Sequence, residues 1–256
     1  MSLAAWLPPD MAPAVALLLI AISLLTSALS AALGLGGGIT LIAVMAQVLP
    51  VPALVPVHGV VQLGSNAGRA LVLRRHVNWP AALWFALGGL AGALLGGSIA
   101  ITLPAPVLRI GLGLFLLWMV WGHGPRLGHM PKRAMAAAGF VATTLSMFFG
   151  AAGPIGGAVL SALGLTRHGF VATQAMTALM MHVLKIVVFG LLGFAFAPWA
   201  GLIVLMIAAG FIGTLLGTRL LGRMPEHGFR IGFRLLMTGL AGSLVWRGAM
   251  ALAAGG

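Results

Sequence analysis

The chain has 256 residues, of which 61% are hydrophobic and 6% are charged. So few charged residues cannot cover the surface of a water-soluble globule of this length, and the composition indicates a polytopic membrane protein. The absence of cysteine excludes disulfides and thiolate metal sites. No alternating pattern of about ten residues suggests a lipid-facing barrel, so we predict an all-α fold.

The formal net charge of +12 comes largely from basic residues in short loops beside apolar spans. Those that define the loops are Arg74, Arg75, Arg126, Lys132, Arg133, Arg219 and Arg223. This placement is typical of loops on the cytoplasmic side of a membrane, whereas a nucleic-acid partner would require a basic patch on a soluble surface. We therefore predict a multi-pass protein of the cell inner membrane, with cytoplasmic basic loops and no nucleic-acid partner.

Ten helical segments follow one another along the chain. They are predicted at residues 11–33, 39–49, 51–73, 79–102, 105–122, 133–150, 155–164, 168–193, 197–221 and 228–250. Crossing a bilayer takes roughly 20 apolar residues, and most segments approach that length. The segments 39–49 and 155–164 are shorter, and each follows a glycine-rich break. We expect these two to be half-helices or arms of re-entrant hairpins.

An internal repeat links the fourth and fifth segments to the ninth and tenth. Adding 121 to seven positions between residues 89 and 111 gives the same residue type each time. The seven positions are Gly89, Gly92, Gly96, Pro104, Arg109, Ile110 and Gly111, and their counterparts are Gly210, Gly213, Gly217, Pro225, Arg230, Ile231 and Gly232. Glycines at helical spacing let helices approach closely in lipid, so these residues indicate a duplication rather than a site.

The duplication divides the chain into two halves. We expect a first helical repeat at 1–122, a cytoplasmic linker at 123–132 and a second helical repeat at 133–256. The basic loops predict that segment 79–102 runs outward and that its counterpart 197–221 runs inward. The two homologous repeats should therefore be inverted, as in many secondary transporters. If only the two short segments fail to cross the membrane, the repeats are parallel instead.

Polar residues form a stripe on one helical face in each half. The stripes consist of His58, Gln62, Asn66 and Arg69 in the first half and of Gln174, Thr177, His182 and Lys185 in the second. An offset of 116 residues aligns the two stripes, so that a cation, Arg69 or Lys185, ends each one. If the repeats pack against each other as inverted pairs do, the stripes would meet in a small, positive, hydrogen-bonding cavity.

The buried cations are the most informative members of these stripes. An ionisable residue at mid-membrane costs about 2.5–3.5 kcal/mol and usually has a functional reason. The only carboxylates of the chain, Asp10 and Glu226, lie outside the predicted spans, which argues against a carboxylate sodium site or proton relay. A negatively charged substrate would supply the missing counter-ion. Other interpretations stay open, since an arginine can snorkel to headgroups and polar residues can simply join helices.

The glycine breaks provide a second kind of anion donor. The residues that open the two short segments are Gly36, Gly37, Gly38 and Thr40 in the first half and Gly153, Gly156 and Gly157 in the second. A helix start offers unpaired N–H groups at the positive end of the helix dipole, and glycine lets a ligand approach the backbone. We therefore expect both breaks to contribute to substrate binding, although Pro154 interrupts the second run.

Three motifs together resemble the TauE/SafE family of membrane transporters, which is associated with sulfite, sulfonate and sulfoacetate export. They are the run from Ser30 to Gly38, the segment from Arg74 to Trp79 and the glycine-rich stretch from Gly88 to Gly97. The resemblance spans nearly the whole chain. It implies an integral membrane transporter with two homologous halves that moves small sulfur-containing or organic anions, and it assigns no catalytic residue.

These observations predict a secondary transporter, with export as the expected direction, for a small oxyanion such as sulfite or an organosulfonate. The expected partners are that anion and the lipid bilayer, and neither enzyme activity nor a cofactor is expected. Two alternatives remain at this stage. One is an anion channel or a scaffold subunit, and the other is an intramembrane metal or enzymatic site built on His58 and His182. No His-Glu-x-x-His helix or evident third ligand supports the latter.

Overall fold

The computed structural model describes residues 7–8, 11–33, 36–122, 127–220 and 226–254 of the chain. Every regular element in this part of the chain is helical, and it contains no strand. Some residues named in the sequence analysis lie outside the described set. They are Asp10, Arg126, Pro225 and Arg223, together with the side chains of Arg69, Arg219, Glu226 and Arg230.

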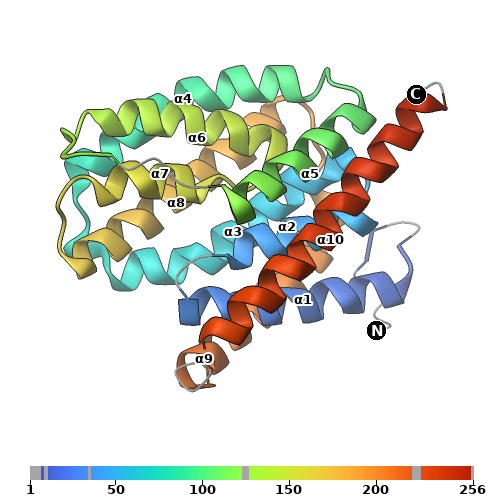
Figure 1. Cartoon of the computed structure of the whole chain (residues 1–256), viewed down its shortest axis with the longest axis horizontal. Coiled ribbons are helices and arrows are strands. Elements are labelled where there is room, and N and C mark those ends of the chain that lie inside the picture. Colours follow the sequence, from blue (N-terminus) through green and yellow to red (C-terminus); the bar gives the residue numbers. More distant parts are fainter. Residues whose placement is uncertain (1–6, 9–10, 34–35, 123–126, 221–225, 255–256) are drawn as a thin grey trace. The chain divides into compact units, whose positions relative to one another are not determined.

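The described residues form ten α-helices and two short 3-10 helices, and Figure 1 shows their arrangement along the chain. The first half contains α1 (Pro13–Leu33), α2 (Gly37–Val48), α3 (Val51–Val72), η2 (Arg74–His76), α4 (Trp79–Ala100) and α5 (Ala105–Trp121). The second half contains α6 (Ala134–Phe149), α7 (Gly153–Ser161), α8 (Arg167–Leu191), η3 (Ala197–Trp199), α9 (Ala200–Leu220) and α10 (Glu226–Ala253).

Five described helices are long and apolar enough to cross a membrane. They span Pro13–Ala31, Trp79–Ala100, His168–Leu191, Ala197–Gly217 and Ile231–Ala253. Large apolar side chains on these helices face outward, among them Leu191, which is 79% exposed, and Trp246, which is 68% exposed. Such surfaces are stable in lipid and would associate in water. The chain is an all-α polytopic membrane protein, as its composition predicted.

Helices of the second half begin at the positions that the two sequence offsets indicate. α2 begins at Gly37 and α7 at Gly153, which is 116 residues later, and the same interval separates the starts of α3 and α8. α4 begins at Trp79 and α9 at Ala200, which is 121 residues later, and α5 and α10 repeat that interval. The matching starts of these four pairs support a duplication that includes at least four helices.

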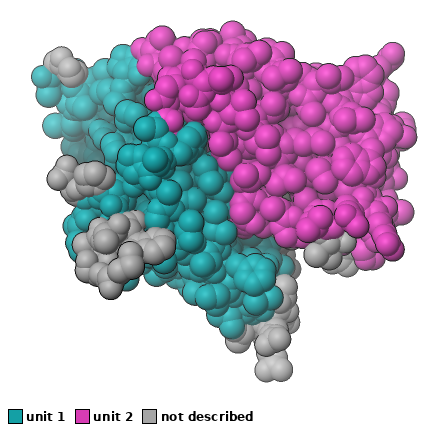
Figure 2. All heavy atoms as spheres, turned by 180° about the vertical axis from the view of Figure 1, so that it is seen from behind, with its two compact units in different colours: residues 1–61, 103–122, 195–256 teal, residues 62–102, 123–194 magenta. Residues whose placement is uncertain are grey.

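The helices form two compact units, each drawn in its own colour in Figure 2. Unit 1 comprises residues 1–61, 103–122 and 195–256, and unit 2 comprises residues 62–102 and 123–194. Unit 1 therefore contains α1, α2, the beginning of α3, α5, α9 and α10. Unit 2 contains the rest of α3 with α4, α6, α7 and α8. Each unit combines helices from both halves of the sequence, so compact packing and sequence homology divide the chain differently.

Glycine contacts explain why helices from different halves pair within each unit. In unit 2, α4 packs against α6, and a Cβ on Gly92 would collide with the carbonyl of Phe140. In unit 1, α9 packs against α1, and a Cβ on Gly213 would collide with the carbonyl of Leu24. Gly213 follows Gly92 by 121 residues, and Phe140 follows Leu24 by 116 residues. The same close backbone approach thus occurs once in each unit, as expected where small residues drive helix association in lipid.

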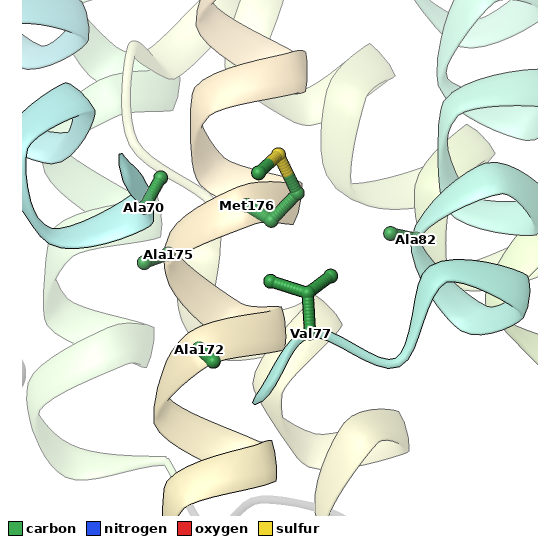
Figure 3. Close-up of a cluster of buried hydrophobic side chains, with 6 residues drawn as sticks. All are labelled: Ala70, Val77, Ala82, Ala172, Ala175 and Met176. Carbon is green, nitrogen blue, oxygen red and sulfur yellow. The ribbon is translucent and has the colours of Figure 1, made fainter. Parts of the chain in front are cut away.

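A cluster of small and medium apolar side chains fixes one end of α8 in unit 2 (Figure 3). Its members come from α3, the η2–α4 connection, α4 and α8, and they are Ala70, Val77, Ala82, Ala172, Ala175 and Met176. Asn78 reinforces this junction, because its side chain accepts a hydrogen bond from Ala81 at the start of α4 and its N–H donates to the Thr173 hydroxyl. The junction holds α8 in place, and with it the polar stripe of the second half.

Candidate functional site

The polar stripe of the second half lies on α8, and most of it is buried. Thr177 is 2% exposed, His182 is 3% exposed and Lys185 is fully buried, while Gln174 is partly buried. Residues three, four or eleven positions apart share a helical face, so Gln174, Thr177 and Lys185 face the same side of α8. All four residues belong to unit 2. The structure therefore places the predicted stripe in the interior of one compact unit.

Lys185 contacts the break between α6 and α7. Its Nζ donates a hydrogen bond of 2.6 Å to the carbonyl oxygen of Gly150, which directly follows α6. Gly150 has a φ of 75°, a left-handed conformation that favours glycine. The Ser146 hydroxyl donates to the same carbonyl over 3.3 Å. The last carbonyls of a helix carry partial negative charge, so this end of α6 offers the ammonium a favourable but incomplete partner.

No carboxylate is available within unit 2 to neutralise Lys185. Residues 62–102 and 123–194 contain neither aspartate nor glutamate. An ammonium has three N–H donors, and among the described residues Gly150 is the hydrogen-bond partner of Lys185. A buried cation held by a single neutral acceptor keeps most of its charge unbalanced. An anion bound beside Lys185 would balance the charge of the protonated side chain.

Gln174 contacts Gly153 at the start of α7, three residues after the Gly150 that Lys185 contacts. Its Nε2 donates to the carbonyl of Gly153 over 3.1 Å. The side chain lies against the glycine face of α7, where a Cβ on Gly157 would be 3.3 Å from Oε1. Oε1 itself is buried and has no hydrogen-bond partner among the described residues. The amide thus fastens α7 with one atom and leaves an acceptor unused with the other.

The other predicted residues of the second half have distinct surroundings. The Thr177 hydroxyl donates over 3.1 Å to the carbonyl of Gln174 one turn earlier, so its oxygen can still accept a hydrogen bond. A Cβ on Gly156 would lie 3.0 Å from the ring of Phe85 on α4. Gly156 therefore serves the packing of α7 on α4, whereas Gly153 and Gly157 lie beside Gln174.

The corresponding position of the first half also fastens a short helix. His58 on α3 is fully buried, and its Nε2 lies 3.0 Å from the carbonyl oxygen of Gly38, the second residue of α2. Because a carbonyl can only accept, Nε2 carries the proton in this contact. His58 precedes Gln174 by 116 residues. An imidazole in unit 1 and an amide in unit 2 thus make equivalent contacts with the starts of α2 and α7.

The glycine break of the first half is shaped by packing within unit 1. Gly36 has a φ of 103°, and the Thr40 hydroxyl donates to its carbonyl over 2.9 Å. A Cβ on Gly37 would collide with the carbonyl of Thr26 on α1. The break therefore meets a strict steric requirement whether or not its N–H groups also bind a ligand.

The remaining stripe residues of the first half belong to unit 2. Asn66 is buried and donates from Nδ2 to the carbonyl of Gln62 over 2.8 Å, one turn earlier on α3. Gln62 is half-buried. The side chain of Arg69, the predicted cation of this stripe, lies outside the described residues. Of the two predicted cations, Lys185 is therefore the one whose side-chain contacts the structure describes.

Comparison with known families identifies the lineage of this chain. The model of the family described as "Sulfite exporter TauE/SafE" matches residues 3–244 of the 256-residue sequence. The chain belongs to the TauE/SafE family. The resemblance indicated by the three sequence motifs is thereby confirmed, and the protein is a multi-pass member of a membrane transporter family. Comparisons with curated proteins and with solved structures gave no significant match.

One residue that contacts the polar stripe of this TauE/SafE protein was not among the predicted binding residues. Gly150 accepts the hydrogen bond from Lys185, but the predicted site began at Gly153. The offset of 116 aligns Gly150 with Gly34, so the glycine repeated at these two positions was a signal in the sequence. Within the described residues, no group of three histidine or acidic side chains is arranged to hold a metal ion.

Proposed function

We propose that the protein is a secondary transporter that exports a small oxyanion, sulfite or an organosulfonate, across the cell inner membrane by alternating access. Membership of the TauE/SafE family supports anion export in general. The observation on which the proposed site depends is Lys185, a fully buried ammonium in a unit whose sequence has no carboxylate. A substrate anion would balance this charge.

The neighbours of Lys185 suggest how the anion would be held. One N–H of the ammonium contacts Gly150, which leaves two donors for substrate oxygens. Hydrogen bonds to charged groups contribute about 1.5–3 kcal/mol each, so these donors would dominate binding. Gln174 and Thr177 would orient the anion, while the glycine-led start of α7 would present the positive end of its dipole.

Corresponding roles are proposed for the other predicted residues. In the first half these are Gly36, Gly37, Gly38, Thr40, His58, Gln62, Asn66 and Arg69. In the second half they are Gly153, Gly156, Gly157 and His182. The contacts of His58 with Gly38 and of Gln174 with Gly153 support assigning the two halves parallel tasks. These residues would orient the ligand or shape the helix starts, whereas the cations supply charge.

We propose that the basic loops are cytoplasmic and that the membrane potential favours export. An inside-negative potential favours expulsion of an anion by about 2.3 kcal/mol per charge per 100 mV. No coupling cation is then required, which agrees with the absence of carboxylates from the predicted spans. Efflux of sulfite from proteoliposomes should therefore increase with an applied inside-negative potential and saturate as the sulfite concentration rises. An unsaturable conductance in planar bilayers would indicate a channel instead.

Replacing the buried cation tests the proposed site directly. Lys185→Gln should weaken sulfite and sulfoacetate binding by roughly tenfold or more, because it removes the charged donor. Lys132→Gln is the matched control, since Lys132 is an exposed lysine of the same unit. Isothermal titration calorimetry of detergent-purified protein would measure both. Equal affinities in the two variants, with both folded by thermal melting, would remove Lys185 from the site.

A further inference from the structure

The orientation of the Gln174 amide is determined by its neighbour. The carbonyl oxygen of Gly153 can only accept a hydrogen bond, so the amide atom 3.1 Å away must be the NH₂ group. Oε1 therefore points elsewhere, and it is buried without a donor among the described residues. A buried acceptor without a donor is unfavourable, and such groups in native proteins call for an explanation.

A fully deprotonated oxyanion would not satisfy this acceptor. Sulfite dianion and simple alkyl sulfonates present only acceptor oxygens, which suit the N–H donors of Lys185 but repel a second acceptor. A ligand that carries a hydroxyl group as well as a negative charge can satisfy both. Gln174 and Lys185 lie eleven residues apart on α8, but their side chains contact carbonyls only three residues apart in the break between α6 and α7. A small ligand at this break is therefore placed to contact both groups.

The charge of the site restricts the ligand further. Lys185 is the one buried lysine or arginine among the side chains that the structure describes. A single ammonium balances a single negative charge, and a dianion would keep one charge uncompensated in a low-dielectric interior. The acceptor and the cation together therefore favour a monoanion that donates a hydrogen bond.

We propose that Gln174 is a specificity-determining residue whose Oε1 accepts a hydrogen bond from the substrate, so that unit 2 selects hydroxyl-bearing monoanions such as hydrogensulfite or a hydroxyalkyl sulfonate. This inference rests on the proposed function, because it assumes that the anion binds beside Lys185. It adds that sulfite is bound in its singly protonated form.

Two sulfonates of the same shape test the inference without changing the ligand charge. Isethionate (2-hydroxyethanesulfonate) and propane-1-sulfonate are both monoanions near neutral pH and differ by a hydroxyl group in place of a methyl group. Calorimetry on the full-length protein in detergent would give the affinity ratio of the pair. We expect the ratio of the isethionate affinity to the propane-1-sulfonate affinity to be roughly tenfold higher in the wild type than in Gln174→Met. Gln47→Met, which makes the same replacement in unit 1, should keep the wild-type ratio.

A second variant keeps the test independent of folding. If Gln174→Met does not fold, Gly157→Ala takes its place, because the added methyl would press on Oε1 at 3.3 Å. It should reduce the preference for isethionate while the Nε2 contact with Gly153 remains. An affinity ratio that is the same in wild type and variants would overturn the role of Gln174, as expected if water satisfies Oε1. In that case the proposal that Lys185 binds the anion stands. If the wild-type protein bound neither sulfite nor any sulfonate, both proposals would be overturned.

Discussion

The starts of α2 and α7 occupy corresponding positions in the two halves, yet they are held differently. His58 fastens α2 at Gly38, and α10 holds the other end of this helix through Gln47. The Gln47 amide donates to the carbonyl of Leu240 over 3.1 Å and accepts from the Ser243 hydroxyl over 2.7 Å. The α2 helix is therefore anchored at both ends by side chains.

The α7 helix is shorter, with nine residues against twelve in α2, and its side-chain anchors gather at its beginning. Gln174 and Lys185 hold Gly153 and Gly150 there. At its other end, the backbone N–H of Met130 donates to Ala162. The duplication thus kept the position of the break but not its backbone conformation, because Gly36 before α2 has a φ of 103° and Ala152 before α7 has a φ of −131°. Packing of Gly37 on α1 constrains the first start most strictly, whereas Lys185 brings a fully buried basic side chain to the second break.

The largest expected difference concerns the first glycine of each short helix. Gly37→Ala should destabilise the protein by about 3 kcal/mol or more, because the new methyl would overlap the α1 backbone at Thr26. Gly153→Ala should cost less than about 0.5 kcal/mol, since the nearest atom to its Cβ is Gln174 Nε2 at 3.7 Å. Thermal melting in detergent would compare the pair. Similar melting temperatures would contradict the view that packing fixes the first break more strictly.

An exchange of the two anchoring residues should have an intermediate effect. His58→Gln and Gln174→His retain a donor for the short-helix carbonyl and should each cost about 1 kcal/mol. His58→Leu removes that donor and leaves the buried carbonyl of Gly38 unsatisfied, at about 1–3 kcal/mol. A fourth variant, Gln174→Leu, completes the set. Chemical denaturation would rank the four single variants by their free energies of unfolding. If the leucine variants were as stable as the exchanged ones, these contacts would not hold the short helices.

The smallest expected effect concerns the far end of α2. Ser243→Ala removes one hydrogen bond to Gln47 and should lower the stability of the protein by about 0.5–1.5 kcal/mol. Ser161→Ala at the end of α7 is the comparison, because this exposed hydroxyl bonds only within its own helix, to Ala158. Its replacement should leave the melting temperature nearly unchanged. A larger loss for Ser161→Ala would argue against the greater anchoring of α2.

Helix positions followed closely from the sequence, because apolar length and loop composition are local properties. The predicted segment 51–73 corresponds to Val51–Val72, and 39–49 corresponds to Gly37–Val48. The second helix starts two residues earlier than predicted, because Gly37 and Gly38 belong to its first turn. Glycine spacing predicted close approach but could not name the neighbouring helix. Pairing of α4 with α6 and of α9 with α1 depends on contacts between distant parts of the chain.

The candidate site was predictable to a similar degree. The α8 stripe is visible in the spacing of Gln174, Thr177 and Lys185, and the structure buries much of it. The carbonyl that receives Lys185 was not predictable, since any acceptor near the break would fit the pattern. The orientation of Gln174 was likewise hidden, because it depends on where the Gly153 carbonyl points.

The pairing of α1 with α9 has a consequence for biosynthesis. The Ser23 hydroxyl donates to the carbonyl of Met206. The N-terminal helix α1 therefore cannot form this contact until the ribosome has synthesised a further 183 residues. All residues of unit 2 have been synthesised once residue 194 is made, whereas unit 1 still lacks residues 195–256. Since contacts between distant residues form late, the part that contains Lys185 should mature first during membrane insertion. Until α9 has been synthesised, lipid or insertion factors would have to cover the surface of α1 that later packs against α9.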